Sequence, residues 1–360
     1  MANGRQPRRK GAPVAVNRRN PRNAKREAEN VGRLLNTVRE VHNTMQNLLE
    51  EGNDESEAQF IELLNRCVEN LGNMEQAYPE NVEVLDTYCE FLVEYSSFLD
   101  GDPVAAAAGF LDRAIAIEPD TSLSRYIQRA RLNPDPAASV GQFIEGINRM
   151  VATNDRELKD AVCDMLDTVV EKYGELTEKL PVQQLHAAVD QTLASIGPLR
   201  SNPEVLISEA SYVIQCTVGN TDEEAVQAAY HHASGLLTRS LEQWVPRINE
   251  DLTGDATPPA EARESAATML MEVGDYDSVL AVCDQLLNMQ PDHFDLRMMV
   301  ARAFNEQSQF DEAREVLEDL RVDISQADGQ DPEVAQFRQM VEDALEQLAR
   351  VQRQAPEAGK

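Results

Sequence analysis

The sequence predicts an all-helical chain, built as a solenoid of helical hairpins that follows a disordered basic N-terminal tail. No segment shows the sustained alternation of apolar and polar residues that a half-buried strand requires, and runs of β-branched residues are short. Apolar residues recur at helical spacing instead. The C-terminal third also contains two similar segments, 260–293 and 294–327, offset by 34 residues.

Charge is spread unevenly along the 360 residues, whose formal net charge is -30. Residues 1–26 hold nine of the 33 basic side chains and no acidic one, which leaves 24 basic against 63 acidic residues in the rest. A body this acidic is a poor partner for nucleic acid and a good one for a basic protein. The PRRK and RRNPR clusters make the tail a candidate for contact with import factors or RNA, with a merely solubilising role as the alternative.

Other classes of protein find little support in the sequence. The five scattered cysteines form no C-x-x-C pair, which favours a reducing compartment, so we expect the cytoplasm and nucleus. No apolar run approaches about 18 residues, so we expect neither a membrane span nor a secretion signal. Phosphate-binding loops, nucleophile elbows and H-E-x-x-H patterns are missing from the sequence. We therefore predict no enzyme, metal, cofactor or small-molecule substrate.

The two similar segments share residues whose positions have physical reasons. Small residues let antiparallel helices approach closely, aromatic residues cover the turns, and a proline closes the first unit because it cannot continue a helix. The repeat-defining residues are Ala267, Gly274, Tyr276, Pro291, Ala301, Phe310 and Ala313.

This period and pattern resemble the tetratricopeptide repeat. There are departures, because Arg263 and Arg297 stand where that repeat has Trp and the second unit lacks the closing proline. The resemblance implies a superhelix in which the first helix of each hairpin lines a groove.

Turn-forming segments divide the chain into parts. The expected parts are a disordered basic tail (1–28), N-terminal helical repeats (29–130), a central helical segment without an assignable repeat register (140–200), C-terminal tetratricopeptide repeats (204–325), a capping helix (326–350) and a disordered end (351–360).

Longer landmarks resemble one particular family. YPENVEVLDTYCEFLVEY, FLDRAIAIEPDTSLSRYIQRARL, EASYVIQ, LLTRSLEQW and ATMLMEVGDYDSVLAVCDQLL occur in an order similar to that of the fungal assembly chaperones of ribosomal protein L-four. The resemblance implies an acidic superhelix that captures the basic extension of a newly made large-subunit ribosomal protein and escorts it into the nucleus.

Two sets of carboxylates are candidates for contact with a basic partner. Their spacing places the first set on one face of one helix, where like charges cost about 0.2–0.5 kcal/mol per pair, a cost that a basic ligand would remove. The first set is Glu83, Asp86, Glu90 and Glu94, and the second set, at groove positions of the C-terminal repeats, is Glu261, Glu264, Glu272, Asp295 and Glu306. A solvated helix face is the alternative for both.

Two further observations bear on the kind of partner. Carboxylate-clamp co-chaperones resemble this fold but use Lys, Arg and Asn in the groove, and here only Arg302 and Asn305 suit that role. The single tryptophan, Trp244, is a candidate anchor for a partner or a closing residue of a core.

The sequence thus predicts a protein-binding chaperone whose acidic groove holds a basic segment of a newly made ribosomal protein before ribosome assembly. The alternative is a non-catalytic scaffold subunit of a larger complex, which would hold its partners through apolar ridges.

Overall fold

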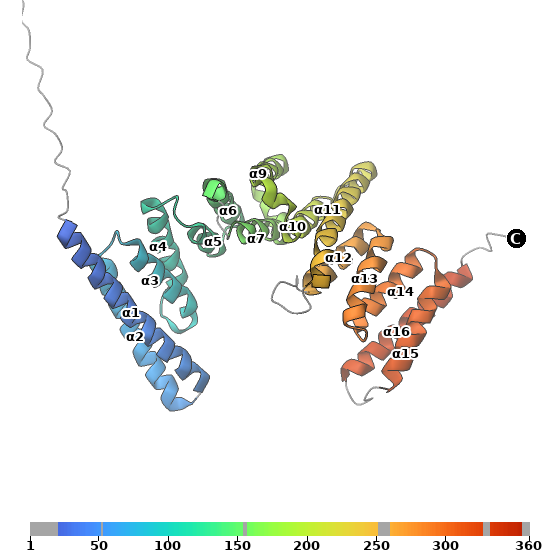
Figure 1. The fold of residues 1–360 in the computed structure, drawn as a ribbon, viewed down its shortest axis with the longest axis horizontal. Coiled ribbons are helices and arrows are strands. Elements are labelled where there is room, and N and C mark those ends of the chain that lie inside the picture. The colour runs from blue at the N-terminus through green and yellow to red at the C-terminus, as the bar shows by residue number, and fades with distance from the viewer. Residues whose placement is uncertain (1–20, 52, 154–156, 251–259, 327–331, 355–360) are drawn as a thin grey trace, which may run out of the picture. The chain divides into compact units, whose positions relative to one another are not determined.

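The computed structural model describes residues 21–51, 53–153, 157–250, 260–326 and 332–354, and the regular elements in these ranges are helices (Figure 1). The predicted all-helical fold is confirmed. The chain divides into two compact units, Met1–Thr121 and Ser122–Lys360. The N-terminal part of the basic tail, residues 1–20, lies outside the described residues, and α1 begins at Pro21, within the segment assigned to the tail.

The first unit consists of two helical pairs. Helix α1 (Pro21–Glu51) packs against α2 (Asp54–Ala77), and α3 (Val82–Glu94) packs against α4 (Pro103–Ile117). Side chains of α1, α2 and α3 share one apolar core, in which Leu35 is fully buried. The first unit therefore has its own hydrophobic core.

The second unit is a row of helices, most of which pack against the next in the chain. They are α5 (Leu123–Arg131), α6 (Pro136–Met150), α7 (Leu158–Glu171), α8 (Tyr173–Lys179), α9 (Val182–Ser195), α10 (Pro203–Gln215), α11 (Glu223–Glu250), α12 (Ala260–Val273), α13 (Tyr276–Met289), α14 (Phe294–Glu306), α15 (Phe310–Gln326) and α16 (Pro332–Gln354). Short 3-10 turns, η2 (Val151–Thr153) and η3 (Gly197–Ser201), lie between them, as η1 (Ser96–Phe98) does between α3 and α4.

Helix α5 belongs with the second unit because it packs very closely on α6. A Cβ atom on Gly146 of α6 would lie 2.5 Å from the Cβ atom of Tyr126 on α5, so only glycine allows this approach. The structural division at Thr121 therefore falls before the boundary at residue 130 that the sequence suggested.

Segment 140–200 departs from a simple repeat because two helices, α8 and α9, stand between α7 and α10, where a regular hairpin has one second helix. Helix α7 packs directly against α10, although α8 and α9 lie between them in the chain. Two first-helix neighbours are thus separated by an extra stretch of sequence, which explains why no regular period can be assigned there.

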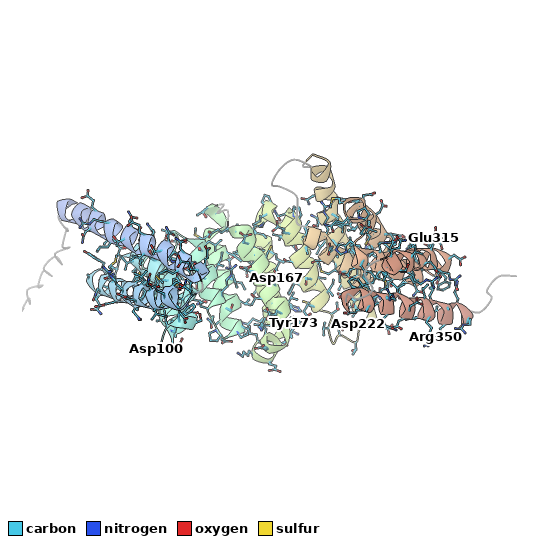
Figure 2. The ribbon with its side chains drawn as sticks, turned by 90° about the horizontal axis from the view of Figure 1, so that it is seen from below. Asp100, Asp167, Tyr173, Asp222, Glu315 and Arg350 are labelled. Carbon is cyan, nitrogen blue, oxygen red and sulfur yellow. The ribbon has the colours of Figure 1, made fainter. Side chains whose placement is uncertain are left out.

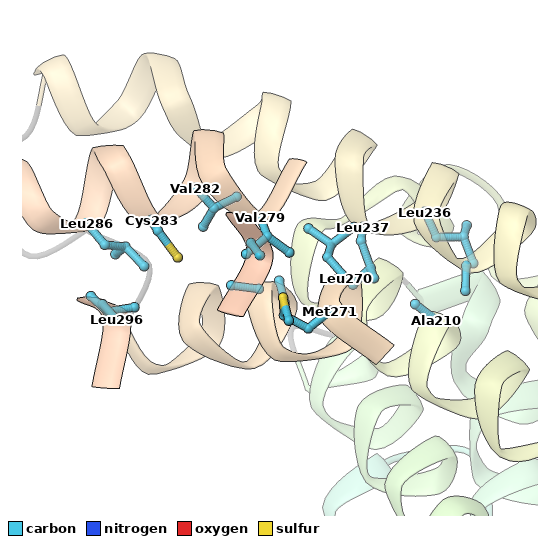
Figure 3. Close-up of a cluster of buried hydrophobic side chains, with 14 of the residues drawn as sticks. Ala210, Leu236, Leu237, Leu270, Met271, Val279, Val282, Cys283, Leu286 and Leu296 are labelled. Atoms are coloured by element: carbon cyan, nitrogen blue, oxygen red, sulfur yellow. The ribbon is translucent and has the colours of Figure 1, made fainter. Parts of the chain in front are cut away.

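The C-terminal hairpins share one continuous core. Side chains from α10 to α14 form a single apolar cluster (Figure 3), in which Ala267 of α12 and Val279 of α13 are fully buried. Ala301 and Ala313 belong to the next cluster, which joins α14, α15 and α16. Helix α16 buries Val341 and Leu348 against α15 and continues to Gln354, past the expected end of the capping helix at 350.

The two C-terminal hairpins turn in the same way at positions 34 residues apart. Gly274 has φ +78° and Ser308 has φ +62°, both in the left-handed region. After Gly274 the N–H of Asp275 donates to Leu270 O at 3.0 Å, and after Ser308 the N–H of Gln309 donates to Phe304 O at 2.8 Å. This is the hydrogen bond of a Schellman motif, so the same helix end is built once on glycine and once on serine.

The two arginines at the Trp position of the repeat are in different states. Arg297 pairs with Asp323 of α15, with 2.6 Å between Nη1 and Oδ2. Arg263 is only 2% exposed, and its three guanidinium nitrogens have no hydrogen-bond partner among the described residues. Burial accordingly lowers the pKa of Arg263. The residue 34 positions before Asp323 is Met289, so the first hairpin lacks the counterion of the second.

We expect Ser308→Gly to stabilise the protein, because serine is strained at positive φ and glycine is not. The relief of about 1–2 kcal/mol, less the entropy that glycine adds to the unfolded chain, leaves a net gain of about 0.5–1 kcal/mol. Urea denaturation would measure it. Gly274→Ala is the matched variant and should lose about 1 kcal/mol; a loss of stability in Ser308→Gly would contradict the account.

We also expect Arg263→Met to raise the free energy of unfolding by about 1–3 kcal/mol, because a buried charge without a partner is replaced by an apolar side chain of similar length. Arg297→Met removes a mostly buried charge that is paired with the exposed Asp323, and should lower the free energy of unfolding by about 1 kcal/mol. Thermal or urea unfolding of both variants measures the two changes in the free energy of unfolding. Equal changes would show that the charge of Arg263 does not destabilise the fold.

Candidate protein-binding surface

A groove in the second unit brings together three of the predicted carboxylates. Its walls come from α12, α14, α15 and α16, and it has a volume of about 690 Å³. Glu272, Asp295 and Glu306 lie on it, and Arg302 is the one cationic side chain among the described residues that line it. We call this the acidic groove. Its charge favours a cationic occupant.

Two of these three acids sit where their helices do not favour them, whereas Asp295 lies in the first turn of α14, where the helix dipole favours a carboxylate. Glu272 lies in the last turn of α12, and Glu306, 34 positions later, ends α14. A negative side chain at a helix C-terminus faces the negative end of the helix dipole, at a cost of about 0.3–1 kcal/mol. Both are exposed and make no ion pair with another described residue. An acid occurs at this position in both hairpins, although the fold gains no stability from it.

The floor of the acidic groove is apolar. Buried Leu317 and Leu348 belong to the core cluster of α14, α15 and α16, and Met298 and Met299 of α14 are half-buried above it. The Oδ1 atom of Asn305, which also lines the groove, is buried and accepts no hydrogen bond from the described residues. The groove thus offers apolar contact and an unused acceptor as well as charge.

A second depression adjoins the acidic groove and shares Thr268 with it. Its lining comes from α7, α10 and α12, and includes the carboxylates Asp167, Glu204 and Glu264 beside several hydroxyl groups. We call this the hydroxyl depression. Figure 2 labels Asp167 on α7. The sequence indicated Glu264 alone, because the two helices α8 and α9 between α7 and α10 break the regular spacing that would show α7, α10 and α12 to be equivalent.

Asp167 is the most perturbed acid of this surface. Asp167 is exposed, but partial desolvation by its surroundings still raises its pKa above the ordinary 3.8, a hydrogen bond with Ser208 opposes the rise, and the nearby Asp164 adds to it. A cation next to Asp167 would lower its pKa again.

Two other acids of the hydroxyl depression already have partners. Lys159 lies 2.6 Å from Glu204 and 3.1 Å from Asp160, and His293 lies 3.4 Å from Glu264. A ligand must therefore compete for these carboxylates.

The acidic face of α3, in the first unit, has basic partners on α1. Arg39 lies 3.4 Å from Glu83, and His42, a cation only when protonated, lies 3.6 Å from Glu94. Partial burial, and then Asp86, raise the pKa of Glu90, while Arg39 and His42 oppose the rise. The sequence showed no basic residue within this stripe, but the neighbouring helix supplies two, so the first set is less available than the second.

Two residues of interest cannot be placed at this surface. The side chains of Glu261 and Trp244 lie outside the described residues, although both positions are helical.

Reactive side chains give no alternative site within the described ranges. His186 Nε2 lies 3.4 Å from Cys216 Sγ and 3.0 Å from the Tyr173 hydroxyl, an arrangement in which a base faces a thiol. Burial raises the pKa of Cys216, which disfavours the thiolate that a nucleophile needs. The described His, Cys, Asp and Glu residues form no group of three suited to a metal ion. None of the described helices combines the length and apolar character needed to cross a bilayer.

Successive antiparallel hairpins with a groove on their first helices define a helical-repeat protein of the protein-binding class. More particularly, residues 270–341 match the tetratricopeptide repeat family, which confirms the resemblance seen in the sequence.

Solved structures with similar folds include two that share little sequence with the chain. One is the assembly chaperone of RpL4 (Acl4), 16% identical over 76% of this chain and 97% of that chain, with a TM-score of 0.47. Another is a tetratricopeptide repeat protein from Parabacteroides merdae, 11% identical over 87% of this chain and 99% of that chain, with a TM-score of 0.41. No curated protein matches the chain in sequence.

We expect Asp167→Asn to stabilise the protein at neutral pH. The native state holds the Asp167 proton more tightly than the unfolded state, so the ionised carboxylate lowers stability above its raised pKa, and this deficit is lost as the pH falls toward the ordinary value. The free energy of unfolding of the variant should therefore exceed that of the native protein at about pH 7, and the two values should converge near about pH 4. Denaturation at both pH values measures this. Asp284→Asn, on the exposed face of α13, is the control.

Proposed function

We propose that the second unit binds a basic segment of another protein along the acidic groove. The observation that carries the proposal is the gathering of Glu272, Asp295 and Glu306, without ion-pair partners among the described residues, on a groove with an apolar floor. The wider chain, with its net charge of -30, adds a field that attracts a cationic partner.

The binding free energy would come from several modest terms. Each hydrogen bond from Lys or Arg to a carboxylate contributes about 1.5–3 kcal/mol when solvent is excluded. The ligand would also remove the cost of acids at the ends of α12 and α14. Because most of these charges are exposed, the affinity should fall strongly as salt is added.

The finer proposal is that the partner is the basic extension of a newly made ribosomal protein, kept soluble until assembly. It is supported by the sequence landmarks that resemble the ribosomal-protein chaperones and by the charge of the chain. The basic residues 1–26 suit an import signal, which accords with a protein that works in the cytoplasm and nucleus. The four acids of α3 are a second candidate contact.

Neutralising the acidic groove should abolish capture of a basic partner. We expect Glu272→Gln, Asp295→Asn and Glu306→Gln together to weaken binding roughly tenfold or more, because three charge-assisted contacts are lost. The measurement is a tagged pull-down at moderate salt with mass spectrometry, followed by titration of the recovered protein.

The control for this experiment changes the same net charge elsewhere. Asp284→Asn, Glu315→Gln and Asp319→Asn lie on exposed positions of α13 and α15, away from the groove, and should leave capture unchanged. A further variant with Gln or Asn at Glu83, Asp86, Glu90 and Glu94 separates the contribution of α3. Recovery of a whole assembly, unaffected by any of these changes, would instead identify a scaffold subunit.

A further inference from the structure

We infer that the occupant of the acidic groove is an amphipathic basic segment, in which an apolar side chain anchors on the methionines and basic side chains continue over the hydroxyl depression. This inference rests on the proposed function and names the chemistry of the partner. A segment of basic and small polar residues alone is a different ligand.

The apolar anchor follows from the floor of the groove. Met271, Met298 and Met299 come together on α12 and α14 above the buried side chains of α15 and α16. Unbranched thioether side chains adapt to apolar groups of different shape, as at other surfaces that bind amphipathic segments. A charged ammonium group placed on this floor would lose its hydration without gaining a partner. An aliphatic side chain would gain contact there.

The unused acceptor in the groove calls for a donor from the same segment. Asn305 Oδ1 is buried and has no partner in the described part of the chain. A buried acceptor that stays unpaired costs about 1–3 kcal/mol. A backbone N–H of a polypeptide bound above Met298 would supply the missing hydrogen bond.

The hydroxyl depression differs from the acidic groove in its hydroxyl groups. Ser208, Ser211, Ser265 and Thr268 lie there beside Asp167, Glu204 and Glu264, although Ile207 and Met269 line it as well. Hydroxyl and carboxylate oxygens accept hydrogen bonds from Lys and Arg, so this half suits charged side chains. Over α14 the segment therefore carries the apolar anchor together with basic residues that face the acids of the acidic groove, and further basic residues continue over α7 and α10.

The charge of the hydroxyl depression is concentrated near Asp167. Lys159 already engages Glu204 and His293 already lies beside Glu264, whereas Asp167 makes no ion pair with a described residue. The first basic residue after the anchor should therefore gain most at Asp167.

The test compares three labelled synthetic peptides of equal length on the full-length protein by fluorescence anisotropy. The first carries two leucines at one end and a Lys/Arg stretch, the second has Ser in place of both leucines, and the third keeps the leucines but has Gln in place of every basic residue. We expect the first to bind roughly tenfold or more tightly than either of the others, since burying one leucine side chain is alone enough for that factor.

Variants of the protein test which part of the segment contacts the acidic groove and which part contacts the hydroxyl depression. Met298→Gln with Met299→Gln should remove the advantage of the leucine peptide over the serine peptide, and Met340→Gln, an exposed methionine of α16 outside the groove, should not. Asp167→Asn should weaken both basic peptides and reduce their salt dependence. The native protein compares the peptides directly, so the test stands even if the double variant unfolds.

The outcomes separate this inference from the proposed function. Equal affinity of the native protein for the leucine and serine peptides would overturn the inference and leave the proposed function intact. Equal affinity for the Lys/Arg and Gln peptides, together with no effect of neutralising Glu272, Asp295 and Glu306, would overturn the proposed function as well.

Discussion

Close packing of antiparallel helices on small side chains is the constraint on which the C-terminal half depends. Ala267 and Ala301 are buried in the first helices of two hairpins, and the left-handed turns at Gly274 and Ser308 return the chain at the same angle 34 residues apart. Because each hairpin buries only part of its apolar surface alone, neighbours must stack to complete the core. The fully shared cluster from α10 to α14 is the result.

This stacking also creates the acidic groove. When α12, α14 and α16 line one side of the row, residues that are far apart in sequence share a wall, and the joint between two core clusters leaves methionines partly uncovered. Acids at the ends of α12 and α14 then gather over an apolar floor. The stacking of the repeated hairpins thus produces a surface that offers both negative charge and apolar contact.

The acids of this surface lower the stability of the folded protein. Asp167 has a raised pKa, and the acids at helix C-termini oppose the helix dipoles. In the first unit two acids of α3 have basic neighbours on α1, because Arg39 lies near Glu83 and His42 lies near Glu94. The difference is physical, since an acid is paired where a neighbouring helix supplies a basic side chain, whereas Glu272 and Glu306 make no ion pair with a described residue.

The sequence by itself determined the helical class, the 34-residue period and the charge of the chain, because these depend on local spacing and composition. It also indicated Glu272, Asp295 and Glu306, whose positions follow from the repeat. Which acids lie close together depends on how the helices pack. Helices α8 and α9 separate α7 from α10 in the sequence, so Asp167 and Glu204 could not be found as neighbours, and the partners of the α3 acids come from α1, more than 40 residues away. Contacts between distant helices depend on packing, which periodicity within one segment does not specify.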